Sequence, residues 1–162
     1  MRQSILRKGK TMFEQRILTI SIDADLKNQN SGQTRHWSTA HREKKIMTTA
    51  LLNGRILYPG DGNLKFSVFC GEIMKHAFDS KVDITVKRIL GKAQRLFDPD
   101  SILRGNCKQL LDAIVDSGIL VDDSSRHIGR VLGVQDATQR DRGPAIEITF
   151  WKSPDEHSTS CP

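Results

Sequence analysis

The sequence predicts a small single α+β domain, in which one mixed or antiparallel sheet packs against two main helices. The first reason is length, because 162 residues suit one domain with an ordinary hydrophobic core. The second is that short segments of alternating apolar and polar residues, typical of strands, recur along the chain. The third is that two longer segments are typical of helices and do not alternate with the strands in a regular βαβ rhythm.

Five segments are expected to be strands. In residues 16–23, Leu18, Ile20 and Ile22 fall on one face. Residues 81–90 show the same period of two, with Arg88 in phase with the apolar residues. Turns rich in Gly, Pro or charged residues separate the segments. The expected strands are 16–23, 64–74, 81–90, 127–137 and 144–152.

Two helices are expected. Residues 36–57 contain no proline, and Ser38 or Thr39 could cap them. Residues 101–117 carry an apolar stripe at helical spacing. Pro99 prevents this helix from starting before Asp100, and Gly118 ends it. The stripe consists of Leu103, Cys107, Leu110, Ile114 and Ser117.

The folded domain is expected to span residues 16–152. Residues 1–15 have the composition of a basic flexible lead, with Met12 an alternative start to Met1, and residues 153–162 that of a disordered tail. No apolar run approaches the ~20 residues of a membrane span, and no signal core precedes the domain. The three cysteines have no metal-binding spacing, so we expect a reduced, cytoplasmic protein. Cys107 is expected to pack inside its helix.

The chain is basic, with 25 Lys and Arg against 19 Asp and Glu. This balance favours a polyanionic partner such as nucleic acid. The plain alternative is a basic surface that serves solubility alone. In the first helical segment and directly before it, positively charged residues are expected to contact a DNA backbone, with an ordinary solvated helix face as the alternative. These residues are Arg35, Arg42, Lys44 and Lys45. Trp37 in the same segment is expected to pack in the core rather than stack.

Aspartates gather at both ends of the second helical segment, against the basic background. Asp98 and Asp100 form an Asp-x-Asp pair, and Asp122 and Asp123 form an Asp-Asp pair. Several carboxylates held close together repel one another, and a divalent cation removes that conflict. Hard oxygen ligands favour Mg²⁺ or Mn²⁺, which suits phosphodiester hydrolysis. The plain alternatives are a helix cap at Asp100 and a solvated turn at the Asp-Asp pair.

The two acidic pairs would meet if residues 118–121 formed a short buried strand beside a strand ending at Asp98. Between the pairs, Arg104, Lys108 and Asp112 are four residues apart and predict one polar stripe on the helix. A salt-bridged solvent face would explain this stripe. The functional interpretation instead places Lys108 or Arg104 beside a scissile phosphate.

Residues 98–125, "DPDSILRGNCKQLLDAIVDSGILVDDSS", resemble the core of the RusA-type Holliday junction resolvases, especially phage and prophage members. The signature of that family is D-x-D-N, a helix with K-x-x-x-D-A-[IL], and then G-x-[IL]-x-D-D. Residues 28–45 and 140–150 are similar in a looser way to its first helix and its closing turn and strand. The resemblance therefore extends over about residues 16–152.

The resemblance implies a homodimer that cuts four-way DNA junctions with Mg²⁺, making paired symmetric nicks in strands of like polarity. It further implies a bacterial or phage-infected host cell. Asp98, Asp100 and Asp123 match the family's metal-binding acids, and Lys108 matches its helix lysine. By position, Asp122 and Asp112 are accessory acids.

The chain departs from the family pattern at two points. Ser101 stands where the family usually has Asn, which removes any hydrogen bond specific to that Asn. The stretch from Asp100 to Lys108 is about one helical turn longer than in the shortest members, which moves the lysine ~6 Å along the helix. Arg104 occupies the shorter spacing, so either cation could act. A second hypothesis is a non-catalytic branched-DNA-binding protein that kept the fold, and a third is a plain scaffold with solvated acids.

Overall fold

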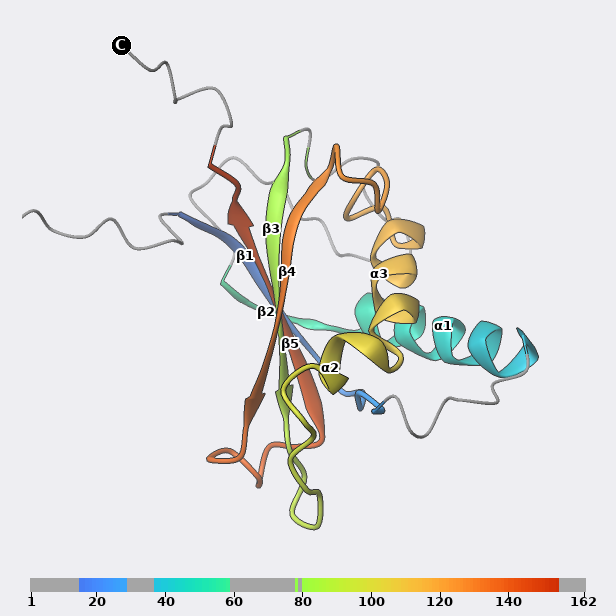
Figure 1. Ribbon diagram of the computed structural model, residues 1–162, viewed down its shortest axis with the longest axis vertical. Helices are drawn as coiled ribbons and strands as arrows, with labels where there is room; N and C mark the ends of the chain where they lie inside the picture. Colours follow the sequence, from blue (N-terminus) through green and yellow to red (C-terminus); the bar gives the residue numbers. More distant parts are fainter. Residues whose placement is uncertain (1–14, 29–36, 59–77, 79, 155–162) are drawn as a thin grey trace, which may run out of the picture.

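The computed structural model describes residues 15–28, 37–58, 78 and 80–154. Within them the chain forms one five-stranded sheet and three helices, and the helices lie together on one side of the sheet (Figure 1). The predicted α+β class is therefore confirmed. The expected strand over 64–74 and nearly all of the expected lead and tail lie outside the described residues.

The sheet is mixed. Its strands are β1 (Arg16–Ile22), β2 (Arg55–Tyr58), β3 (Val82–Ile89), β4 (Ile128–Asp136) and β5 (Ala145–Lys152). They lie in the order β2-β1-β5-β3-β4, and only the β3–β4 pair is parallel. A parallel pair needs a crossover connection, and here the crossover holds the two shorter helices. Four of the five expected strands are thus confirmed, and none of their ends is shifted by more than one residue.

The hydrophobic core lies between the helices and one face of the sheet. Alternation places every second residue of β1, β3 and β5 on this face, and these side chains are almost fully buried. Among them are Leu18, Ile20, Ile22, Val82, Ile84, Val86, Ile146, Ile148 and Phe150. The sequence pattern identified the β1 and β3 members correctly.

Helix α1 (Trp37–Leu52) is shorter than the predicted 36–57 segment. The chain turns at Gly54, where a Cβ would lie 2.8 Å from Ile20 Cγ2 and 3.0 Å from the Leu51 carbonyl oxygen. Residues 55–58 then leave the helix and pair with β1 as β2. The helix therefore ends where only a glycine fits against β1, and the longer prediction was wrong.

The start of α1 also differs from the prediction. Ser38 and Thr39 lie inside the first helical turn, so neither occupies the position before the helix. Trp37 is 74% exposed, so the prediction that it packs in the core was wrong.

The second predicted helix is divided into α2 (Ser101–Arg104) and α3 (Cys107–Asp116). The break at Gly105 and Asn106 lies against the segment that follows β1. The Lys27 N–H donates to Asn106 Oδ1 at 2.8 Å, and a Cβ on Gly105 would lie 1.6 Å from the Lys27 carbonyl oxygen. A continuous helix would place side chains where this backbone runs.

The break changes which side chains of the predicted stripe are buried. Leu103 is 39% exposed, whereas its neighbour Ile102 is buried. Cys107 and the rest of the stripe are buried as predicted. Burial raises the pKa of the Cys107 thiol to about 12, so this side chain stays protonated in the core.

Gly118 ends α3 as predicted, with a φ of 73°. The Gly118 N–H donates to the Val115 carbonyl, and the Ile119 N–H donates to the Ile114 carbonyl. This pair of bonds is a Schellman motif, which reverses the chain at the helix end. Among the helices of the described residues, none has the length and apolar character that crossing a lipid bilayer requires.

Candidate functional site

The Asp-x-Asp pair lies at the end of an irregular loop between β3 and α2. The predicted strand ending at Asp98 is wrong, because β3 ends at Ile89. Asp98 and Asp100 are both exposed. Asp100 occupies the N-cap position of α2 as the plain alternative expects, but its side chain makes no capping hydrogen bond. Its carboxylate instead lies 3.2 Å from Arg104 Nη2.

The Asp-Asp pair lies in the turn region between α3 and β4. Residues 118–121 form no strand, so that prediction was wrong, but Ile119 and Leu120 are buried as an apolar return would be. Their burial and the reversal at Gly118 bring Asp123 alongside α3. The loop between α3 and β4 therefore runs back alongside α3, and it does so without forming a strand.

Lys108 joins the helix to this returning chain. Its ammonium nitrogen lies 3.4 Å from Asp112 Oδ1 and 3.8 Å from Asp123 Oδ2. Asp112 is one turn further along α3, whereas Asp123 comes from the following loop. One cation thus stands between two carboxylates that would otherwise repel each other.

Asp122 points its carboxylate into its own turn. One of its oxygens accepts the Asp123 N–H at 2.9 Å. A hydrogen bond from the Ser124 side chain lowers the pKa of the Asp122 carboxyl below its ordinary value. The Ser124 carbonyl accepts the N–H groups of His127 and Ile128 and so leads the chain into β4.

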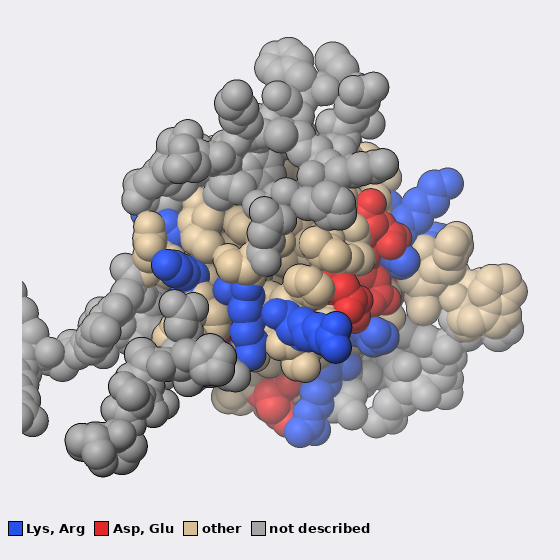
Figure 2. All heavy atoms as spheres, turned by 90° about the horizontal axis from the view of Figure 1, so that it is seen from above, with Lys and Arg blue, Asp and Glu red and all other residues tan. Residues whose placement is uncertain are grey.

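The predicted site residues therefore form two groups. Lys108, Asp112 and Asp123 come together, and Asp100 pairs with Arg104. The predicted polar stripe on one helix was wrong, because Arg104 belongs to α2 and the other two residues to α3. Figure 2 shows acidic side chains gathered beside Lys and Arg side chains on the surface that it views from above.

The donor chemistry of the predicted metal ligands fits Mg²⁺ or Mn²⁺, because exposed carboxylates are the oxygen ligands these cations prefer. In the part of the chain that the structure describes, no three His, Cys, Asp or Glu side chains are grouped closely enough to hold a metal ion. The metal set of Asp98, Asp100 and Asp123 accordingly stays a prediction.

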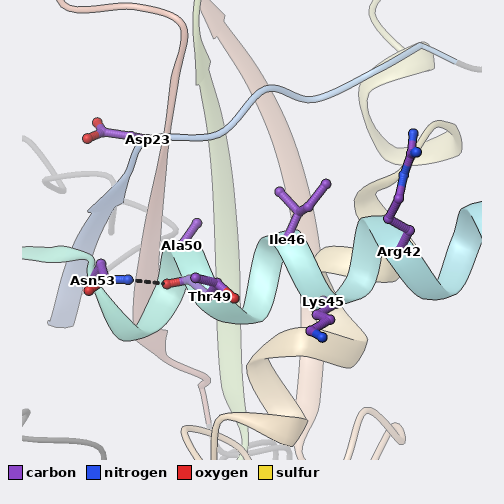
Figure 3. Close-up of a pocket in the computed structure, with 7 residues that line it drawn as sticks. All are labelled: Asp23, Arg42, Lys45, Ile46, Thr49, Ala50 and Asn53. Carbon is purple, nitrogen blue, oxygen red and sulfur yellow. Dashed lines mark hydrogen bonds between the residues drawn. The ribbon is translucent and has the colours of Figure 1, made fainter.

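The predicted DNA-contacting residues of α1 differ in their surroundings. Arg42 and Lys45 are exposed and line an open cavity of about 490 Å³ along α1, to which Asp23 contributes from the chain after β1 (Figure 3). Lys44 instead faces α3, where its ammonium lies 2.6 Å from Asp116 Oδ2. This hydrogen bond raises the pKa of Lys44. Arg35 lies outside the described residues.

Sequence reasoning missed a group of residues around Arg88. This side chain is only 2% exposed and contacts the loop that leads to the Asp-x-Asp pair. The signal was present, since Arg88 falls in phase with the apolar residues of β3. A charged residue on the buried face of a strand needs buried polar partners, but the sequence pattern does not indicate which residues supply them.

Comparison with protein-family models gives no match, and no curated protein matches the chain. The resemblance to the RusA-type resolvases therefore rests on residues 98–125 and their looser flanks.

Proposed function

We propose that this chain is a Mg²⁺-dependent, structure-selective endonuclease that resolves four-way DNA junctions. The observation that carries the proposal is the position of Lys108 between Asp112 and Asp123. These residues are three of those that the sequence pattern selects, and the fold brings them together from α3 and the loop before β4. The excess of positive charge suits a protein that holds nucleic acid.

Asp98, Asp100 and Asp123 are the residues that would hold the metal ion, either Mg²⁺ or Mn²⁺. The bound ion would supply an activated water and neutralise charge on the phosphate. All three carboxylates are exposed, so they are accessible to a cation and to DNA. Asp122 would orient the turn that carries Asp123, through its bond to the Asp123 N–H.

The cations beside the acids have a separate role in the proposal. Lys108 is 72% exposed, and Arg104 is exposed to a similar extent. Either side chain would stabilise negative charge that develops on the scissile phosphate. Arg42 and Lys45 would contact the DNA backbone from the exposed side of α1. Two copies of the chain would act as a homodimer, in the cytoplasm of a bacterial or phage-infected cell, and make paired nicks.

A second candidate is a branched-DNA-binding protein that does not cut. Two observations favour it: Ser101 replaces the family's usual Asn, and the described residues contain no group of three acids arranged for a metal. This candidate predicts junction binding that weakens steeply with salt and produces no nicks.

The test compares wild type with Asp100→Asn and Asp123→Asn on a labelled four-way junction and on a linear duplex of the same sequence. Asp141→Asn is the matched control, since Asp141 is an exposed acid paired with Lys92 rather than with a site residue. We expect the two site variants to bind the junction and not cut it, while the control cuts normally. Full cutting by Asp100→Asn would contradict the assignment of that ligand.

A further inference from the structure

The loop between β3 and the Asp-x-Asp pair is fastened by side chains from other parts of the chain. Residues 90–97 form neither helix nor strand. Arg140 Nη1 donates to the carbonyl oxygens of Gly91 at 2.8 Å, Gln94 at 2.7 Å and Lys92 at 3.4 Å. One arginine from the β4–β5 connection thus holds the first half of the loop.

Arg88 holds the second half. Its Nη1 donates to the Arg95 carbonyl at 3.1 Å, and its guanidinium carbon lies 3.7 Å from the centre of the Phe97 ring. Asp25 supplies the opposite charge, with Oδ1 at 3.3 Å from Arg88 Nε. A buried guanidinium is tolerated only with such partners, and stacking on an aromatic face adds attraction. The fold therefore buries the Arg88 charge, which costs desolvation free energy, at a place where the side chain can hold this loop.

Gln135 of β4 fixes the backbone at the end of the loop. Its side-chain oxygen accepts the Phe97 N–H at 2.8 Å, and its side-chain nitrogen donates to the Phe97 carbonyl at 2.8 Å. The amide thereby satisfies both backbone groups of Phe97, as a neighbouring strand would. Asp98 is the next residue.

The segment after β1 binds the chain on both sides of the Asp-x-Asp pair. Before the pair, Gln94 Nε2 donates to Asp25 Oδ2 at 2.8 Å. After it, Asn106 Nδ2 donates to the Asp25 carbonyl at 3.3 Å, and Asn106 Oδ1 accepts the Lys27 N–H at 2.8 Å. Asp98 and Asp100 therefore sit in a stretch held at both ends, although their own carboxylates are exposed.

We propose that Arg88 and Gln135 are positioning residues that hold the Asp98–Asp100 stretch in place for a divalent cation. The inference rests on the proposed function, because that function supplies the reason to fix two exposed carboxylates. Ligands that are already ordered bind without a further loss of conformational freedom. A loosened stretch would bind the cation more weakly while the sheet stays intact.

The test uses Gln135→Met, which keeps the length of the side chain. It removes both bonds to Phe97 and also the 3.4 Å bond that Gln135 Oε1 accepts from Arg88 Nη1. Gln135 is only partly buried, and in this variant the buried Arg88 keeps its ion pair with Asp25, whereas changing Asp25 would remove that pair. Thr85→Val is the matched control. It removes a side-chain acceptor on the opposite face of the same sheet, where Trp151 Nε1 donates to Thr85 Oγ1 at 2.9 Å.

Two quantities are measured on the full-length protein. The first is amide hydrogen exchange in peptides covering residues 91–101, followed by mass spectrometry. The second is the Mn²⁺ concentration that half-saturates cleavage of a four-way junction. In Gln135→Met we expect exchange to quicken roughly tenfold, from the loss of the hydrogen bonds that Gln135 makes to Phe97 and Arg88. We expect half-saturation to need roughly 10 to 100 times more Mn²⁺, while Thr85→Val changes neither quantity.

A purely structural role for Gln135 would lower the amount of active protein and leave the half-saturating Mn²⁺ concentration unchanged. That result would overturn the inference, and so would unchanged exchange in residues 91–101. Should wild type not cut at all, the proposed function fails, and Mn²⁺ binding is then read by electron paramagnetic resonance. Weaker Mn²⁺ binding by Gln135→Met would still support the positioning role, and equal or absent binding in both proteins would overturn it.

Discussion

Lys108 Nζ lies 3.8 Å from Asp123 Oδ2, which joins α3 to the loop that precedes β4. The contact depends on the reversal at Gly118, because a helix that continued would carry Asp123 away from Lys108. Lys108 also contacts the helix acid Asp112, so that Asp112 and Asp123 lie beside one cation. The helix residues Lys108 and Asp112 and the loop residue Asp123, which the resemblance assigns to one site, are therefore neighbours in the fold.

The first prediction concerns which cation serves the reaction. Lys108→Ala should lower junction cleavage by roughly 100-fold, the loss typical for removing one group that stabilises transition-state charge. Arg104→Ala should cost less than about tenfold in the same assay, because Arg104 pairs with Asp100 and lies outside the group of Lys108, Asp112 and Asp123. Cleavage rates at saturating Mg²⁺ measure the two losses, and circular dichroism checks that both variants are folded. The opposite order of the two losses would assign the role to Arg104.

A second prediction separates the lysines of α1. Lys45→Ala should reduce the slope of log Kd against log salt for junction binding by about 1, because an exposed lysine releases one counterion. Lys44→Ala should reduce it by less, because Asp116 already pairs with that charge. Binding is measured by fluorescence anisotropy across a salt series. A larger effect for Lys44→Ala than for Lys45→Ala would contradict this placement of the DNA backbone.

A third prediction concerns the break between α2 and α3. Gly105→Ala should lower the free energy of unfolding by about 1–3 kcal/mol, the usual cost of overpacking. The added Cβ would meet the Lys27 carbonyl oxygen at 1.6 Å, and a backbone atom cannot move away as a side chain can. Urea unfolding measures the loss. Arg104→Ala, on the exposed surface one residue earlier, should change stability by less than about 0.5 kcal/mol.

A fourth prediction follows the ionisation of Asp122. Its pKa is lowered from the ordinary value of 3.8, first by the hydrogen bond from Ser124. A lowered folded pKa means that the bond stabilises the fold above the ordinary pKa and is lost as the pH falls through the lower value. Carboxyl carbon NMR should give a midpoint below 3.8, and Ser124→Ala should raise it. A midpoint that Ser124→Ala leaves unchanged would contradict this cause.

Much of the fold could be predicted because the alternation of apolar and polar residues along the strands is visible in the sequence. Leu18, Ile20 and Ile22 mark the buried face of β1, and Gly118 marks the end of α3. The ends of helices set by tertiary contact could not be predicted in the same way. Gly54 lies against the Ile20 side chain and Gly105 against the Lys27 backbone, and a helix ends near each glycine for this reason. The periodicity of apolar residues in a helix does not indicate such contacts.

The candidate site was predictable in its residue types and less so in its arrangement. The order of acids and the intervening lysine are visible in the sequence, and the contact of Lys108 with Asp123 agrees with them. Asp98 was expected at the end of a strand, whereas it follows an irregular segment, residues 90–97, that Arg88 and Gln135 hold. The contacts of Gln135 with Phe97 join residues 38 apart in the sequence, and a sequence without its fold does not reveal such support.

The measurement that tests the central proposal most directly is incubation of the wild-type protein with an end-labelled synthetic four-way junction, with Mg²⁺ and with EDTA, followed by mapping of the cut sites. We predict paired, symmetrically placed nicks in two strands of like polarity with Mg²⁺, and none with EDTA. Junction binding without nicks at any Mg²⁺ or Mn²⁺ concentration would contradict it and leave a protein that binds branched DNA without cutting it.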